Sequence, residues 1–144
     1  MPQSRVVLCA VYGLIALAAL IATWSQNLAY FGNPADFVSA LGAFLIDVKV
    51  NPAARSIAAD IALVFLAAAI FMVIEARKHG VRFVWAYVVG GLFVAISVTL
   101  PLFLIARELR LATPDADHLR SIDVALLAGL TALVALLTVW IDAM

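Results

Sequence analysis

The stretch SIAADIALVFLAAAIFMVIEAR, residues 56–77, decides the fold class of this chain. Every residue between Asp60 and Glu75 is apolar. A helix needs about 20 predominantly apolar residues to cross the roughly 30 Å hydrocarbon core of a bilayer, and this stretch meets that need. It therefore predicts a membrane helix, and it raises the question of why a carboxylate stands at position 60.

The composition of the whole chain supports a membrane protein. The 144 residues are 67% hydrophobic and 12% charged, with a mean hydropathy of +1.15. Soluble domains are roughly 45–50% apolar and about 25% charged, and a soluble domain of this length could not bury so much apolar side chain. The formal net charge is zero, which gives no indication of nucleic-acid binding. The lone Cys9 and the absence of C-x-x-C and HExxH motifs argue against a disulfide or a metal site.

Apolar segments with the length of a membrane helix recur along the chain. Only helices and closed barrels satisfy their backbone in lipid, and the alternating pattern of barrel strands is missing. We therefore predict an all-α fold, a single membrane domain over residues 1–144 that forms a four-transmembrane-helix bundle. The expected spans are residues 6–23, 57–74, 83–105 and 124–141. Asn51 followed by Pro52 is typical of a helix start and is expected to open the second helix.

The connection between the first two spans is too long for a plain turn. It begins with an Asn-Pro pair, and apolar residues then recur at helical spacing from Phe37 to Val48. This pattern predicts a short amphipathic helix over about residues 34–48, lying on the membrane surface or over the end of the bundle.

The distribution of basic residues bears on orientation. Four full crossings would place both termini on one side of the membrane. That side would hold Arg5, Arg77, Lys78 and Arg82, and the other Lys49, Arg55, Arg107, Arg110 and Arg120. The counts nearly balance, but the compact basic segment EARKHGVR, residues 75–82, favours a cytoplasmic position for the N-terminus and the C-terminus.

Asp60 is the candidate for function. It is expected about one turn, or ~5 Å, inside the second span, and a carboxylate in a membrane helix costs roughly 2.5–3.5 kcal/mol at the centre and less near the interface. A third helix antiparallel to the second would bring Arg107 to the same membrane face, where it could pair with Asp60. The polar cluster predicted there consists of Trp24, Asn27, Tyr30, Ser56, Asp60 and Arg107. We consider three roles for it: a structural ion pair, a ligand or substrate site, and part of a proton or ion pathway.

Glu75 and Pro101 have simpler interpretations. Glu75 follows Asp60 by fifteen residues, or ~22 Å along a helix, so the two acids cannot act as a catalytic pair. Local salt bridges to its basic neighbours explain Glu75. Pro101 removes one backbone donor, which either kinks the third helix toward the Asp60 end or is merely tolerated in a membrane helix. Gly90 and Gly91 permit close helix packing.

Three sequence segments, NLAYFGN, AADIALVFLAAAIFMVIEARKHG and AISVTLPLFLIARE, together resemble a bacterial membrane-protein family called domain of unknown function 2834. The resemblance covers about residues 6–110. It rests on Asp60, Glu75, Arg77, Gly80, Pro101, Phe103, Arg107 and Glu108. It implies a small integral protein of the bacterial inner membrane, and it implies no activity.

The sequence is compatible with three functions. The first is that of a non-enzymatic protein that binds a membrane lipid or another lipophilic small molecule. Such a protein could also be an accessory subunit of a membrane complex or form a homo-oligomer. The second is an enzyme in which Asp60 acts as a general acid on an isoprenoid-like substrate. The third is a small transporter. The low polar content favours the first function, and no cofactor is expected.

Overall fold

A computed structural model describes residues 3–31, 37–111 and 121–142, all but Leu111 and a few turn residues in helices. Four segments in this part of the chain are long and apolar enough to cross a membrane, as predicted. They are Gln3–Tyr30, Pro52–His79, Val84–Arg110 and Ser121–Ile141. Residues up to 112 form one compact unit, and the last segment, helix α6 (Ser121–Asp142), belongs to a second unit.

The first unit contains α1 (Gln3–Asn27), followed by a 3-10 turn (Leu28–Phe31), and the short helix α2 (Phe37–Asp47). The predicted short helix between the first two spans is thus confirmed over Phe37–Asp47, and residues 34–36 lie outside the described residues. Tyr30 joins α2 to the end of α1: its hydroxyl donates to Asp47 Oδ2 at 2.9 Å, and its ring contacts Phe44 edge-on.

Helix α3 (Pro52–His79) begins as the sequence predicts. The Asn51 side chain accepts a hydrogen bond of 2.8 Å from the Ala54 N–H, and Pro52 occupies the first turn, where a missing donor costs nothing. The helix ends at Gly80, whose φ of 68° is a left-handed conformation that glycine adopts without strain. Both ends of the second predicted span are therefore fixed by local chemistry.

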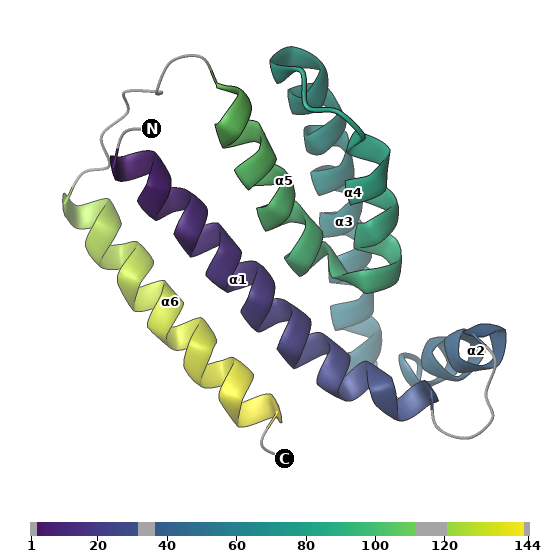
Figure 1. Cartoon of the computed structure of the whole chain (residues 1–144). Helices are drawn as coiled ribbons and strands as arrows, with labels where there is room; N and C mark the ends of the chain where they lie inside the picture. Colours follow the sequence, from purple (N-terminus) through teal and green to yellow (C-terminus); the bar gives the residue numbers. More distant parts are fainter. Residues whose placement is uncertain (1–2, 32–36, 112–120, 143–144) are drawn as a thin grey trace. The chain divides into compact units, whose positions relative to one another are not determined.

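The third candidate span is folded back on itself. It comprises α4 (Val84–Gly90), a π-helical turn (Gly91–Ala95) and α5 (Ile96–Arg110). In a continuous helix Tyr87 and Phe103 would lie ~24 Å apart along the axis, but their ring centroids are 5.7 Å apart. Figure 1 shows α4 and α5 running in opposite directions, joined at the π-helical turn.

Glycines permit this reversal. A Cβ atom on Gly91 would lie 3.0 Å from the Thr99 hydroxyl and 3.0 Å from the Phe65 ring, and one on Gly90 would lie 3.1 Å from Thr99. The chain turns at Ala95, whose backbone is extended. The helix does not break at Pro101, which lies buried within α5; of the two alternatives for Pro101, the structure fits a proline tolerated within the helix. The prediction of close packing at the two glycines is confirmed.

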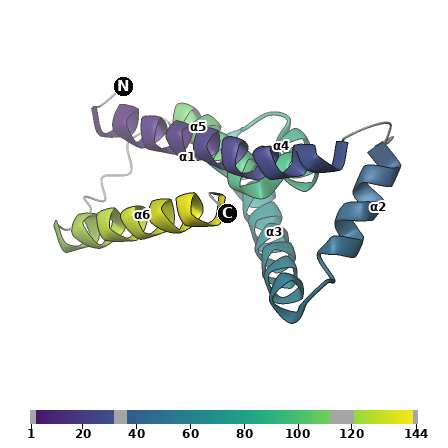
Figure 2. The same cartoon turned by 90° about the horizontal axis from the view of Figure 1, so that it is seen from below.

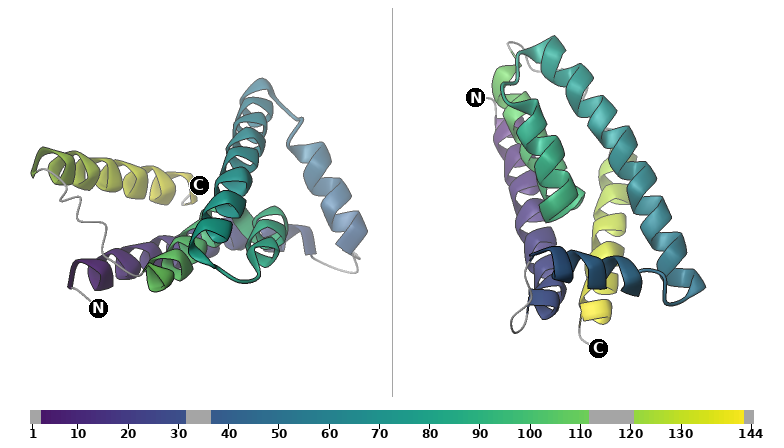
Figure 3. Two further views of the ribbon diagram at one scale, coloured as in Figure 1. Left: turned by 90° about the horizontal axis from the view of Figure 1, so that it is seen from above. Right: turned by 90° about the vertical axis from the view of Figure 1, so that its right-hand side faces the viewer.

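Helix α5 occupies the centre of the first unit. It lies along α1 and also contacts α3 and α4, as Figures 2 and 3 show from other directions. The fully buried Phe103 of α5 and Met72 of α3 form the core with Ala76, Val84 and Val88. At the turn, the Trp24 indole of α1 donates to the Val94 carbonyl at 3.2 Å. This bond satisfies a carbonyl where the helical pattern is interrupted.

Candidate functional site

The end of α3 carries a buried carboxylate surrounded by basic side chains. Glu75 accepts a hydrogen bond of 2.5 Å from Arg107 Nε of α5. Within α3 itself, His79 Nε2 lies 3.3 Å from Glu75 Oε2, and Lys78 Nζ lies 3.9 Å from Glu75 Oε1. The prediction of local salt bridges at Glu75 is confirmed, but the shortest contact comes from a residue 32 positions away.

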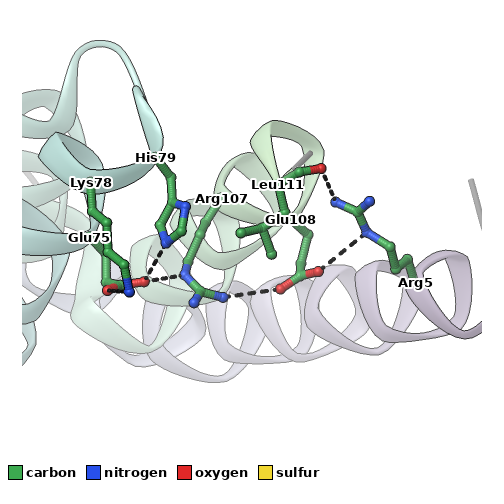
Figure 4. A network of polar contacts seen from close by, with 7 residues as sticks. All are labelled: Arg5, Glu75, Lys78, His79, Arg107, Glu108 and Leu111. Atoms are coloured by element: carbon green, nitrogen blue, oxygen red, sulfur yellow. Dashed lines mark hydrogen bonds and ion pairs between the residues drawn. The ribbon is translucent and has the colours of Figure 1, made fainter. Parts of the chain in front are cut away.

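The contacts continue from α5 to α1. Arg107 Nη1 donates to Glu108 Oε1 at 3.2 Å, and Arg5 Nε lies 3.5 Å from Glu108 Oε2. Arg5 also donates from Nη2 to the Leu111 carbonyl at 3.2 Å, near the end of α5. Figure 4 shows the resulting row of contacts. We call Arg5, Glu75, Lys78, His79, Arg107 and Glu108 the charged network.

Burial and charge define what the charged network can do. Glu75 and Glu108 are each only 9% exposed, and Arg5 and Arg107 face them. Charges placed at low exposure are tolerated when they are paired and hydrogen-bonded. Two carboxylates and two guanidinium groups form ion pairs with one another, and these pairs join α1, α3 and α5. The geometry supports a structural role, in which the ion pairs hold the three helices together, better than it supports a ligand-binding site.

The predicted pair of Asp60 and Arg107 is wrong. Arg107 bonds Glu75 and Glu108, and Glu75 lies ~22 Å along α3 from Asp60. Asp60 is exposed, and no hydrogen bond or ion pair links it to the residues that the structure describes. The cause is the fold-back at residues 91–95, which returns the end of α5 to the end of α3. A straight third helix would have carried Arg107 to the opposite end.

The other members of the predicted polar cluster do not gather around Asp60. Trp24 binds the Val94 carbonyl at the π-helical turn, and Tyr30 binds Asp47 of α2. Asn27 is half-buried near the end of α1, and Ser56 is exposed on α3. The structure therefore brings Trp24 and Tyr30 into packing contacts between elements, not into a common site.

The residues on which the family resemblance rests have several different structural roles. Glu75 and Glu108 belong to the charged network, Gly80 caps α3, and Pro101 is buried in α5. Arg77 is exposed. The sequence analysis missed Arg5 and His79 as partners. A usable signal was present, because charges next to membrane helices are costly and tend to pair with one another.

A groove lies between α3 and α4. It has a volume of about 460 Å³, which is within the roughly 300–1,000 Å³ of small-molecule sites. Apolar side chains line it: Phe65, Leu66, Ala69, Ile70, Val73, Ile74, Trp85 and Val88. The groove is open on one side, so lipid acyl chains could reach it directly from a surrounding bilayer.

A second pocket, of about 600 Å³, lies where α3 turns into α4. Its lining includes the cationic residues Arg77 and Arg82 beside Gly80 and Phe83, and it shares Trp85 with the apolar groove. Neither pocket suggests a metal centre. Among the described residues, no group of three or more His, Cys, Asp or Glu side chains could hold a metal ion.

These features define the class of the protein. It is an all-helical, multi-pass membrane protein, with its charged residues concentrated at helix ends and its long helices apolar. More specifically, the chain belongs to the family described as "Protein of unknown function DUF2834", whose sequence profile matches residues 11–109. Neither the curated proteins nor the solved structures contain a match to the chain.

Proposed function

We propose that this protein is a non-enzymatic membrane protein that binds a lipophilic ligand in the apolar groove between α3 and α4. The groove itself is the observation that carries the proposal, because it combines a suitable volume with an apolar lining. Its walls are anchored by the core around Met72 and Phe103, so the groove has a formed shape before any ligand enters. A membrane lipid, or a lipophilic small molecule dissolved in the membrane, is the ligand class.

The geometry gives less support to catalysis at Asp60. A general acid needs a protonation site next to its substrate and groups that orient it. Asp60 is exposed and without a polar partner among the described residues, and it does not line the groove. The low polar content of the groove likewise gives no support to a transport pathway. A protein partner, or a second copy of the chain, remains the alternative occupant of the apolar surfaces.

We further propose that the protein resides in the bacterial cytoplasmic membrane with its N-terminus in the cytoplasm. The fold-back supports this orientation, because it moves Arg107 and Arg110 to the end of the first unit that holds Arg5. That end also carries Arg77, Lys78 and Arg82, while the other end carries Lys49 and Arg55. Loops rich in Lys and Arg remain cytoplasmic. Arg120 lies outside the described residues.

Filling the groove tests the proposal. Ala69 lines the groove and is half-buried, whereas Ala67 is exposed on the same helix and does not line it. We expect Ala69→Leu to lower the amount of lipid retained by protein extracted in mild detergent, and Ala67→Leu to leave it unchanged. Native mass spectrometry measures bound lipid and any protein partner in one spectrum.

Two outcomes would contradict the proposal. One is equal lipid retention by the Ala69→Leu and Ala67→Leu variants, which would mean that the groove holds no specific ligand. The other is a protein subunit that is lost from the Ala69→Leu variant alone, which would mean that the groove is a protein interface.

A further inference from the structure

The apolar groove and the cationic pocket adjoin at Trp85, which lines both, and together they present a surface with two chemistries. The groove presents only hydrocarbon and aromatic side chains, and the pocket adds two guanidinium groups. A ligand that fills both must have a long apolar part and an anionic head, which is the chemistry of an anionic phospholipid.

The cations of the pocket differ from those of the charged network. Lys78, Arg107 and Arg5 contact carboxylates, but Arg77 has no ion pair with any residue in the described part of the chain. Arg82 lies against the ring of Phe83, 5.9 Å from its centroid, and no carboxylate contacts it among the residues described. Both guanidinium groups are therefore available to an external anion such as a phosphate.

The length of the surface fits one leaflet of a bilayer. Gly80 lines the pocket and Phe65 lines the far part of the groove. They are fifteen positions apart along α3 and its cap, a rise of ~22 Å. A bilayer with its headgroup regions is about 40–45 Å thick, so one leaflet measures roughly 20–22 Å. Arg77 and Arg82 lie at the outer end of this length, where a headgroup belongs.

The backbone at the corner supports a built site. Phe83 has a φ of 59°, and it alone among the non-glycine residues described has a positive φ. A bulky residue in the left-handed region is strained, and such strain often occurs at functional sites. Phe83 is also 79% exposed, so the strain does not serve core packing. It presents an aromatic ring at the rim of the pocket, beside Arg82.

We propose that this surface binds one anionic phospholipid, with its phosphate at Arg77 and Arg82 and an acyl chain in the groove along α3 and α4. The inference rests on the proposed lipophilic ligand and adds the charge of its headgroup. Zwitterionic lipids fill the groove but gain less from the two guanidinium groups.

Native mass spectrometry with added lipid tests this inference on the full chain. The probes are palmitoyl-oleoyl phosphatidylglycerol and palmitoyl-oleoyl phosphatidylcholine. The test variant is Arg77→Gln/Arg82→Gln. The control is Lys49→Gln/Arg55→Gln, which removes two charges at the other end of α3. We expect the test variant to lose phosphatidylglycerol affinity roughly 25-fold and the control to lose little, because each basic residue near an anionic lipid contributes about fivefold.

The outcomes separate this inference from the proposed function. Equal binding of the two lipids by the wild-type chain would overturn the anionic headgroup but leave the groove as a lipid site. Loss of lipid in neither the arginine variant nor the Ala69→Leu variant would overturn both. Displacement of the phospholipid by millimolar inorganic phosphate would also overturn the inference, because the pocket would then recognise free phosphate.

Discussion

Glu75 is held by contacts from two helices at once. Its carboxylate is 9% exposed, and it contacts Arg107 of α5 as well as Lys78 and His79 of its own helix. Removing one partner of a buried ion pair leaves an uncompensated charge, which costs up to about 3–5 kcal/mol. The pair is therefore expected to determine whether α5 stays against α3.

A double-mutant cycle measures this contact. We expect Glu75→Gln and Arg107→Gln each to lower the thermal midpoint in detergent, and the double variant to lower it by less than the sum. Groups in direct contact show coupling energies of roughly 0.5–3 kcal/mol. The readout is the fraction of monodisperse protein after heating.

Asp60→Asn is the matched control for that cycle. Asp60 has no polar partner among the described residues, so its neutralisation is expected to leave the midpoint unchanged or to raise it. A decrease in the thermal midpoint as large as that of Glu75→Gln would mean that Asp60 has a polar partner in the native protein and is not exposed.

Among the secondary-structure elements, the packing of α4 against α5 depends on glycine residues at the turn between them. The space beside Gly91 is occupied by Phe65 of α3, Thr99 of α5 and Ile96. Gly13 of α1 is a useful contrast, because a Cβ atom there would meet nothing within 4 Å. The same substitution at the two glycines therefore separates loss of space from the change in helix propensity.

We expect Gly91→Leu to destabilise the protein by at least about 1–3 kcal/mol, because overpacking forces neighbouring groups apart. Gly13→Leu is expected to be neutral or to stabilise by up to about 1 kcal/mol, as helix propensity predicts. Thermal midpoints in detergent compare the two variants. A midpoint of Gly91→Leu equal to or above that of Gly13→Leu would show that α4 and α5 do not pack as described.

The elements themselves were largely predictable from the sequence. Apolar run length predicts the candidate spans, and the Asn51–Pro52 start follows from capping chemistry. The short helix Phe37–Asp47 follows from apolar spacing. The reversal at Ala95 did not follow, because hydropathy is the same for a straight helix and for a folded one. Gly90 and Gly91 indicated close packing, but they did not say which helix would approach.

At the scale of the first unit, the reversal of the chain at Ala95 explains why the predicted polar cluster around Asp60 does not form. It moved Arg107 away from Asp60 and toward Glu75, so the predicted cluster was wrong while its motif residues were retained in another place. Which charged residues pair across helices depends on the direction in which each helix runs. The hydropathy of an apolar segment does not encode that direction. The pockets between α3 and α4 are lined by side chains from both helices, and the packing of those side chains cannot be predicted from apolar run length.

The reversal also predicts which side of the membrane each charged end occupies. Helix α5 rises ~22 Å, less than the roughly 30 Å of the hydrocarbon core, and its end contacts Arg5 at the start of α1. We therefore expect Arg110 on the same side as Ser4, with Lys49 on the opposite side. Four full crossings would instead place Arg110 with Lys49.

Cysteine accessibility distinguishes these arrangements. In a Cys9→Ala background, Ser4→Cys and Arg110→Cys should react with a membrane-impermeant maleimide from one side, and Lys49→Cys from the other. Joint labelling of Arg110→Cys and Lys49→Cys would show that residues 84–110 cross the membrane.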